Sequence, residues 1–396
     1  MKTRTIQLVL LTIALIINAC KSADFSEDSL KNSEKQLIAL REVALKENKI
    51  PRTVKDGNLS WVHKGYDWTI GFWPGTCWMM YEKTKDPKWK EAALKGQSLY
   101  KDYKNLTNDH DLGFIFNNSY GKAYKITKDE KCKEVLIDAS NSLITRFNKN
   151  VGCIQSWDVV DNWQSKRGWK FPVIIDNMMN LEMLFEASLI TGDDKYKNIA
   201  ITHANTTMRN HFRKDGSSYH VLDYNPETGE ILSKVTAQGY ADNSAWARGQ
   251  SWGLYAFTMC YRYTKDKKYL DFAEKIASFI LNHPNYPKDG VPYWDYNAPN
   301  IPKADRDASS GAILASGLLE LSDYTNGKYK NQAEHILKSL ASEKYSAKYG
   351  ENGNFVLKHN VGSFPAGNEV NVPLNYADYY YIEALLRLEE RTKNKV

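Results

Sequence analysis

Closely spaced cysteine pairs, dense basic tracts and long internal apolar runs are all missing from this sequence of 396 residues. Its five cysteines form no CxxC pair and stand at no metal-ligand spacing to a histidine, so we predict neither a zinc site nor an obligatory disulfide framework. The formal net charge of +6 is spread along the chain, which argues against nucleic-acid binding. After the first twenty residues, no segment is long and apolar enough to cross a membrane.

The first twenty residues have the pattern of a bacterial export signal. Lys2 and Arg4 form a basic start, and the apolar stretch Leu8–Ile17 is too short to span a bilayer. The letters INAC that end at Cys20 resemble a lipobox, in which the cysteine becomes the lipidated N-terminus. Simple secretion with cleavage nearby is the alternative.

This reading divides the chain into three parts. We expect a signal peptide over residues 1–19, a lipoprotein-type tether over 20–32 and one catalytic domain over 33–396. The protein would then reside in the periplasm or at the outer membrane, and a lipid on Cys20 would be its only attachment to a membrane.

A turn signature of the form Thr-x-Asp recurs along the chain, each time between two apolar helical patterns. The threonine and aspartate suit a tight turn followed by the N-cap of a second helix. Each copy therefore predicts a helical hairpin. The four clear copies, with a degenerate fifth at Tyr324–Tyr329, begin at Thr84, Thr127, Thr191 and Thr264.

Five hairpins are visible, and a sixth can be assembled from the chain ends, Ser29–Lys46 and Tyr376–Arg391. Twelve helices from six hairpins predict an all-α (α/α)6 barrel, with a linear solenoid as the main alternative. The closed ring is favoured because the loops that enter the inner helices carry Trp, His and Asp residues. Strand patterns are limited to short pieces such as Tyr219–Asp223 and Asn354–Lys358.

Two aspartates stand at expected starts of inner helices. Asp111 follows His110 and lies three residues before Phe114, whereas Asp176 interrupts the apolar run from Phe171 to Leu184. Helix capping alone would explain an aspartate at such a position. Apolar surroundings, however, raise the pKa of a carboxyl and keep a proton available, and two carboxyls in unequal environments suit acid–base chemistry on sugars.

Other candidates have structural alternatives as well. Arg248, in WARGQSW, could recognise an anionic substrate group or form an ion pair beneath the rim of the site. The tryptophans Trp68, Trp157, Trp163 and Trp252 could line a cleft or belong to the core. The histidines outside the loop motifs have no ligand spacing and are treated as surface or core residues.

Together these loops resemble glycoside hydrolase family 88, the unsaturated glucuronyl hydrolases. The resemblance runs from about Trp61 to Leu388, and the motifs GFWPG, HDLGF, IIDNMMNLEML, DGSSYH and WARGQSW occur in the family's order. It implies an (α/α)6 barrel that needs no metal or organic cofactor. It also implies removal of the 4,5-unsaturated uronic acid that polysaccharide lyases leave on oligosaccharides, by protonation of C4 and addition of water at C5.

The resemblance also implies roles for individual residues. Asp176 would be the acid and base, and Asp111 would orient the ring and support the developing charge. The expected substrate contacts, polar and aromatic, are His110, His220, Gln238, Arg248, Trp252, Trp68 and Phe72. Trp157 and Trp163 compete for one further aromatic position. Residues 359–376, which contain Ser363 and no Lys or Arg, are expected to form a rim without a strong sulfate clamp.

Three rival functions remain open at this point. The related family 105, the unsaturated rhamnogalacturonyl hydrolases, shares the chemistry but acts on pectin fragments. An inverting glycosidase would cleave by ordinary hydrolysis and keep the double bond. A non-catalytic glycan-binding lipoprotein would have no use for a buried acid. The sequence favours an unsaturated oligosaccharide substrate and leaves the oligomeric state undetermined.

Overall fold

The computed structural model describes residues 2–63 and 65–393, and it describes side chains from Phe25 onward. Cys20 and the predicted signal peptide of residues 1–19 lie outside the described side chains, so both remain predictions.

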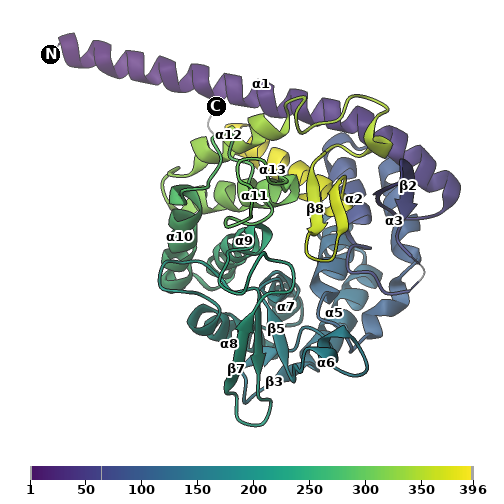
Figure 1. The fold of residues 1–396 in the computed structure, drawn as a ribbon. Helices are drawn as coiled ribbons and strands as arrows, with labels where there is room; N and C mark the ends of the chain where they lie inside the picture. The colour runs from purple at the N-terminus through teal and green to yellow at the C-terminus, as the bar shows by residue number, and fades with distance from the viewer. Residues whose placement is uncertain (1, 64, 394–396) are drawn as a thin grey trace.

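Helical hairpins dominate the described chain (Figure 1). The inner members are α2 (Phe72–Thr84), the π-helix η2 (Gly113–Gly121) with α4 (Lys122–Thr127), α7 (Asn177–Thr191), α9 (Ala247–Thr264), α11 (Ala308–Tyr324) and α13 (Asn375–Lys393). Their outer partners are α3 (Pro87–Ser98), α5 (Glu130–Ile144), α8 (Asp194–Asn210), α10 (Lys267–Asn282), α12 (Lys330–Leu340) and α1 (Lys2–Glu47).

The inner helices form a closed ring. Each packs on the next, and α13 returns to pack on α2, so the described part of the chain closes on itself (Figure 1). The inner helices α9 and α11 are buried on nearly every side, whereas the outer helices α10 and α12 bury one stripe. The predicted all-α (α/α)6 barrel is confirmed, and the linear solenoid is excluded.

The Thr-x-Asp turns have the predicted structure. Asp86, Asp129, Asp193 and Asp266 are the N-caps of α3, α5, α8 and α10, and each side chain accepts a hydrogen bond from the backbone N–H two residues later. The middle residue of every turn is left-handed, with φ between 55° and 73°. The recurring signature therefore sets the reversal from inner to outer helix.

Short strands lie at the end of the barrel where the inner helices begin. The antiparallel ribbons pair β1 (Pro51–Lys55) with β2 (Asn58–Trp61), β3 (Phe147–Asn148) with β4 (Cys153–Ile154), and β8 (Asn360–Ser363) with β9 (Asn368–Val372). A three-stranded sheet has the order β5 (Pro172–Ile174), β6 (Val221–Tyr224) and β7 (Ile231–Val235). The single turn α6 (Trp163–Lys166) and the 3-10 turns η1 (Lys101–Asn105) and η3 (Asn352–Asn354) complete the elements.

One of the two strand predictions is wrong. Residues 219–223 overlap β6, but residues 354–358 begin with the last residue of η3 and form no ladder strand, only an isolated antiparallel bridge between Leu357 and Ser346. The backbone N–H groups of Val356 and Leu357 donate instead to the carboxylate of Asp378, both at 2.8 Å. A side chain thus takes the donors that a neighbouring strand would use.

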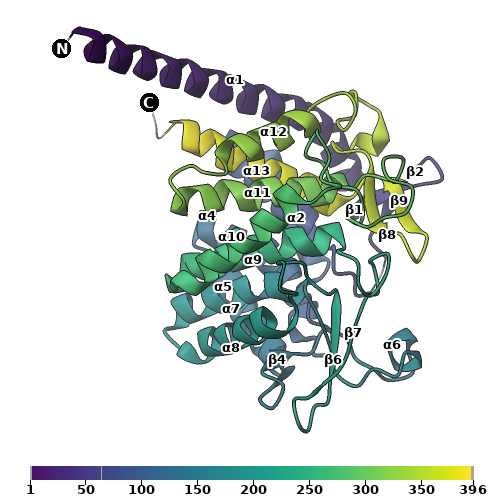
Figure 2. The same ribbon diagram turned by 60° about the vertical axis from the view of Figure 1, so that its left-hand side comes forward.

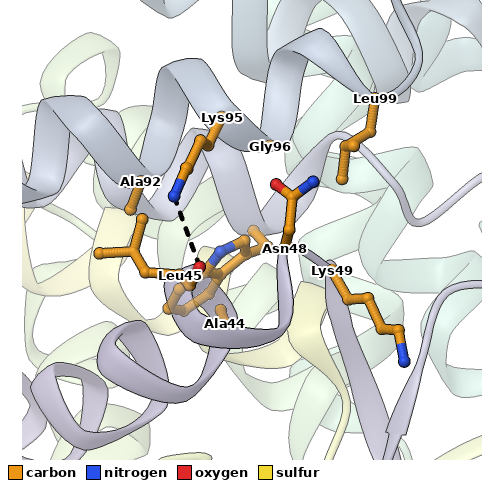
Figure 3. A pocket seen from close by; sticks show the side chains of 9 residues that line it. Ala44, Leu45, Asn48, Lys49, Ala92, Lys95, Gly96 and Leu99 are labelled. Atoms are coloured by element: carbon orange, nitrogen blue, oxygen red, sulfur yellow. Dashed lines mark hydrogen bonds between the residues drawn. The ribbon is translucent and has the colours of Figure 1, made fainter.

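The packed part of α1 begins before residue 33. Ser26 is buried, Leu30 is 2% exposed, and Leu30, Leu37 and Leu40 belong to the main core. Near its end α1 lies against α3, where Lys95 donates to the carbonyl of Leu45 beside a gap of about 10 Å³ that holds at most one water molecule (Figure 3). Within the described side chains, no helix reaches the length and hydropathy needed to cross a bilayer.

Candidate active site

The N-terminal ends of the inner helices gather the predicted polar residues. Asp111 lies two residues before η2, Asp176 is the N-cap residue of α7, and Arg248 lies in the first turn of α9. Every inner helix runs in the same direction, so these loops meet at one mouth of the barrel, beside the β5–β6–β7 sheet.

Asp176 faces His220 across the end of that sheet. The backbone N–H of Ile175 donates to the His220 carbonyl at 3.1 Å, and this bond extends the β5–β6 ladder to the two residues. Asp176 Oδ2 then lies 3.6 Å from His220 Nε2, slightly beyond hydrogen-bond length. The Asp176 side chain makes no capping bond, so capping does not explain its position.

Asp111 is held by the first turn of α7. Its Oδ1 atom accepts a hydrogen bond from Asn180 Nδ2 at 3.2 Å and lies 3.4 Å from His110 Nε2. Asn180 also accepts from the backbone N–H of Phe114 at 2.9 Å. A side chain one helical turn after Asp176 therefore fixes the neighbouring aspartate.

Buried polar atoms without partners converge here. Asp176 Oδ2, His220 Nε2 and His110 Nε2 are all buried, and none has a hydrogen-bond partner among the described residues. Buried polar groups are nearly always paired in folded proteins. Three such atoms at one mouth mark the place where the polar groups of a ligand would bind.

The carboxyl of Asp111 has a raised pKa. Burial raises the pKa of its carboxyl well above the usual range, and the charges of Asp109 and Asp176 add to the effect. Burial also lowers the pKa of His110, which favours the neutral ring. The sequence argument expected a raised pKa at Asp176, and the structure adds a second carboxyl, Asp111, whose pKa burial raises.

Asp109, His110 and Asp111 are the described residues whose ligand atoms cluster closely enough to suggest a metal ion. One oxygen of each carboxylate already has a protein donor. Asp109 Oδ1 accepts from the Tyr66 hydroxyl at 2.6 Å and from the backbone N–H of Asp111 at 3.0 Å. This cluster is better explained as a scaffold for Asp111 than as a metal site.

The choice between Trp157 and Trp163 has a geometric answer. The Trp157 ring is 6.5 Å from that of His110 and 6.3 Å from that of His220, edge to face in both cases. Trp163 contacts Trp157 at 5.2 Å and neither histidine. Of the two tryptophans, Trp157 is therefore the one that borders His110 and His220.

Among the other predicted aromatic contacts, only Trp68 keeps exposed surface. It lies 4.9 Å from Tyr376 and 5.7 Å from Phe72, which is fully buried behind it. Trp252 is also fully buried, packed 5.2 Å from Phe114. The prediction that Trp252 stacks on a sugar is therefore not supported, because the surrounding aromatic residues cover its ring.

Arg248 is fully buried and forms an ion pair. Its guanidinium donates to Asp307 Oδ2 at 3.0 Å, to the Gly362 carbonyl at 2.6 Å and to the Val361 carbonyl. It thus fixes β8 against α9 and α11, as the structural alternative for this residue predicted. Its Nε atom has no partner among the described residues.

Gln238 and the rim lie beside this anchor. Gln238 Nε2 is 3.5 Å from the Gly362 carbonyl, so the half-buried glutamine lies between His220 and the β8–β9 hairpin. Arg52 joins the same hairpin to the loop before Trp68, because it binds both Glu369 and Asp67. The rim expected over residues 359–376 is thereby tied to the wall of the mouth.

Asn180 and Asp307 were missed by sequence reasoning. The spacing of four residues between Asp176 and Asn180 places both on one helix face, and this signal was available. Asp307 gave no such signal, because its partner Arg248 is 59 residues away.

Comparison with known proteins identifies this architecture. The model of the glycosyl hydrolase family 88 matches residues 46–391. The chain belongs to glycosyl hydrolase family 88. An unsaturated glucuronyl hydrolase of Formosa agariphila is 48% identical over 330 residues, which cover 82% of this chain and 81% of that protein. An unsaturated chondroitin disaccharide hydrolase of Streptococcus pneumoniae is 36% identical over 81% of each chain.

Solved structures of family 88 agree closely in shape. An unsaturated glucuronyl hydrolase specific for heparin superposes with a TM-score of 0.89 at 45% identity, over 93% of this chain and 98% of that one. The unsaturated glucuronyl hydrolase of Bacillus sp. GL1 superposes with a TM-score of 0.85 at 29% identity, over 93% of this chain and 97% of that one. The resemblance found in the sequence is confirmed, and the protein is a glycoside hydrolase.

Proposed function

We propose that this family 88 enzyme is an unsaturated glucuronyl hydrolase, which removes the 4,5-unsaturated uronic acid from lyase-generated oligosaccharides of the glycosaminoglycan type. One observation carries the proposal: two buried carboxyls meet at one mouth, and the unpaired oxygen of Asp176 faces an imidazole. Relatives that bear this name or that of a chondroitin disaccharide hydrolase support the substrate class.

In the proposed reaction the first step is a proton transfer. Two carboxyls that feel each other's charge resist being ionised together, so the pair retains a proton to higher pH than an isolated aspartate. Asp176 transfers a proton to C4 of the C4=C5 double bond, because its Oδ2 atom is free. The positive charge that develops at C5 and the ring oxygen is stabilised by the remaining carboxylate.

Water completes the reaction. Asp176, now ionised, takes a proton from a water molecule while the oxygen of that water bonds to C5, and a hemiketal forms. The bond from C5 to the ring oxygen then breaks, giving a ketone at C5 and a hydroxyl at C1. The hemiacetal at C1 collapses to an aldehyde and releases the shortened sugar. The sum is addition of one water molecule and loss of the double bond.

The surrounding side chains have distinct parts in this proposal. The Nε2 proton of His220 steadies the Asp176 carboxylate, and neutral His110 offers its unpartnered Nε2 atom to the sugar. Trp157 and Trp68 supply apolar walls. Arg248 positions β8, and Gln238 lies where it can reach the substrate.

The experiment follows the ultraviolet absorbance of the double bond. Wild-type enzyme is offered unsaturated disaccharides from chondroitin, hyaluronan, heparin and pectin lyases, with Asp176→Asn and Asp111→Asn in parallel. We expect loss of absorbance with the glycosaminoglycan products and a drop in kcat of at least 10³-fold in both variants. Asp193→Asn, a matched change at an outer N-cap where asparagine caps equally well, is the control. Cleavage with the double bond retained would refute the proposal.

We also propose that lipid on Cys20 anchors the enzyme in the periplasm or at the outer membrane. The apolar stretch that ends shortly before Cys20 supports this, as does the lipobox-like sequence INAC. Labelled palmitate incorporated by wild-type cells but not by a Cys20→Ala strain would bear the proposal out. Equal partition of both proteins into the aqueous phase would contradict it.

A further inference from the structure

An exposed tryptophan lies just outside the catalytic mouth. Trp163 begins the short helix α6, at the periphery of the molecule (Figure 2), and 46% of its surface is exposed. Large apolar side chains are costly to leave in water, and a partly exposed tryptophan near a carbohydrate site is a candidate contact. The proposed reaction at C4 and C5 makes no use of it.

Contacts between rings connect Trp163 to the catalytic residues. Trp157, which borders His110 and His220, is 5.2 Å from Trp163 and stacks on Trp169 at 6.0 Å. Trp163 and Trp169 meet edge to face at 5.5 Å. The three rings form one aromatic wall that leads outward from the mouth.

Hydrogen bonds hold this wall in place. Arg146 pairs with Asp158 at 2.9 Å and donates to the Gln155 carbonyl at 2.9 Å. Asn162 and Ser165 form a complete capping box around the start of α6. A surface fixed before the ligand arrives loses less entropy on binding than a free loop would.

Three cations near the wall form no ion pair among the described residues. The Arg167 guanidinium lies 5.3 Å from the Trp163 ring and 5.1 Å from the Trp169 ring, and it donates to the Thr236 carbonyl at 2.8 Å. Lys166 and Lys170 flank it in the sequence. Among the described residues, none of these three cations has a carboxylate within 4.0 Å, whereas the nearby Asp158 is already paired with Arg146.

We propose that Trp163 and Arg167 form an outer subsite that binds the saccharide units beyond the first sugar of the leaving group. The flat indole would take the apolar face of a sugar ring, and the guanidinium would bind its carboxylate or sulfate. The bound ligand is thus an anionic oligosaccharide longer than a disaccharide. This inference rests on the proposed function and adds a preference for chain length and charge.

The test compares two substrates of one polymer, an unsaturated disaccharide and the corresponding unsaturated tetrasaccharide. For Trp163→Ala we expect the ratio of kcat/KM for tetrasaccharide to kcat/KM for disaccharide to fall at least fivefold, mainly through KM. Arg167→Gln should produce a similar fall and should weaken the dependence of the tetrasaccharide reaction on salt. Leu232→Ala, at a side chain with a similar exposure of 43% on β7, is the matched control.

Each outcome has a defined meaning. An unchanged ratio in both variants overturns the subsite, as does an equal loss on both substrates, which would mean that Trp163 only supports Trp157. A fall in the ratio in both variants but not in Leu232→Ala supports it. If the wild-type enzyme consumes the double bond of neither substrate, the proposed function itself has failed.

Discussion

His220 presents the proton of its Nε2 atom to Asp176 Oδ2 across 3.6 Å, because its Nδ1 atom is occupied. The backbone N–H groups of Ala237 and Gln238 donate to Nδ1 at 3.0 and 3.2 Å. An N–H group can only donate, so Nδ1 carries no proton and the neutral ring is protonated at Nε2. The tautomer is therefore set by the backbone of the loop and not by a neighbouring side chain.

This arrangement predicts a difference between two substitutions. His220→Ala removes the proton that faces Asp176, and we expect kcat to fall about 10²-fold. Gln238→Ala keeps the backbone N–H that sets the tautomer, so its effect should fall mainly on KM. Steady-state kinetics on an unsaturated disaccharide separates the two. Equal losses of kcat would mean that the side chain of Gln238, and not the His220 proton, supports the chemistry.

Asn180 affects the ionisation of Asp111. Its amide hydrogen bond lowers the pKa of Asp111 and opposes the effect of burial. Asn180→Ala should therefore raise that pKa further, so that the protonated form survives to higher pH and the alkaline limb of the kcat profile moves upward. The unpaired N–H of Phe114 should also cost about 1–3 kcal/mol in the free energy of unfolding.

A stability effect alone would not move the pH profile. Asn205→Ala is the matched control, because Asn205 accepts a hydrogen bond from the Tyr269 hydroxyl between α8 and α10, away from the mouth. The Asn205→Ala substitution should lower Tm and leave the alkaline limb of the kcat profile unchanged. If the alkaline limb of Asn180→Ala coincides with that of wild type, Asn180 does not act on the ionisation of Asp111.

The barrel could be predicted from the sequence because its signals are local. Each Thr-x-Asp turn is made within a few residues, and Asp86 caps α3 whatever the rest of the chain does. The location of the loop residues before the inner helices could then be predicted as well, because a ring of hairpins brings those loops to one mouth. Asp176, His220 and Asp111 were found in this way.

The partners of those residues depend on contacts between distant parts of the chain. Arg248 meets Asp307 and Gly362 only when α9, α11 and β8 have assembled, so its sequence context left two interpretations open. Trp252 was expected in the site, and no local pattern shows that Phe114 and Tyr380 cover its ring. The raised pKa of Asp111 likewise depends on distant parts of the chain, because it comes first from burial of the carboxyl in the assembled mouth and then from the charges of Asp109 and Asp176.

Arg248 offers a test of its two interpretations. Arg248→Lys cannot reproduce the three hydrogen bonds to Asp307, Val361 and Gly362, and it leaves buried groups unpaired. We expect a loss of about 3 kcal/mol in the free energy of unfolding, together with a higher KM as β8 shifts. Asp307→Asn should weaken stability in the same way, and the double variant should show non-additive losses. A variant with normal Tm but reduced kcat would favour direct contact with substrate.

Asp378 makes the stability of the folded protein dependent on pH. Its carboxyl is 2% exposed, and burial raises its pKa from the ordinary 3.8 to about 7, although the N–H groups of Val356 and Leu357 pull the pKa down. A raised folded pKa means that the stabilising contribution is fully present below about pH 4 and is lost as the pH rises through about 7. The difference corresponds to roughly 4 kcal/mol.

Asp378→Asn cannot ionise, and it keeps one of the two oxygens that accept from Val356 and Leu357, so it loses one of these hydrogen bonds at every pH. The free energy of unfolding of wild type should therefore fall relative to this variant between pH 5 and 8, by roughly 2–4 kcal/mol when measured by urea denaturation. Asp193→Asn is the matched control, because the hydrogen bond from the backbone N–H of Lys195 lowers the pKa of that exposed carboxyl, so its difference from wild type should stay constant between pH 5 and 8. Equal differences between Asp378→Asn and wild type at pH 4.5 and 8.5 would show that Asp378 holds no proton near neutrality, and that its two hydrogen bonds outweigh its burial.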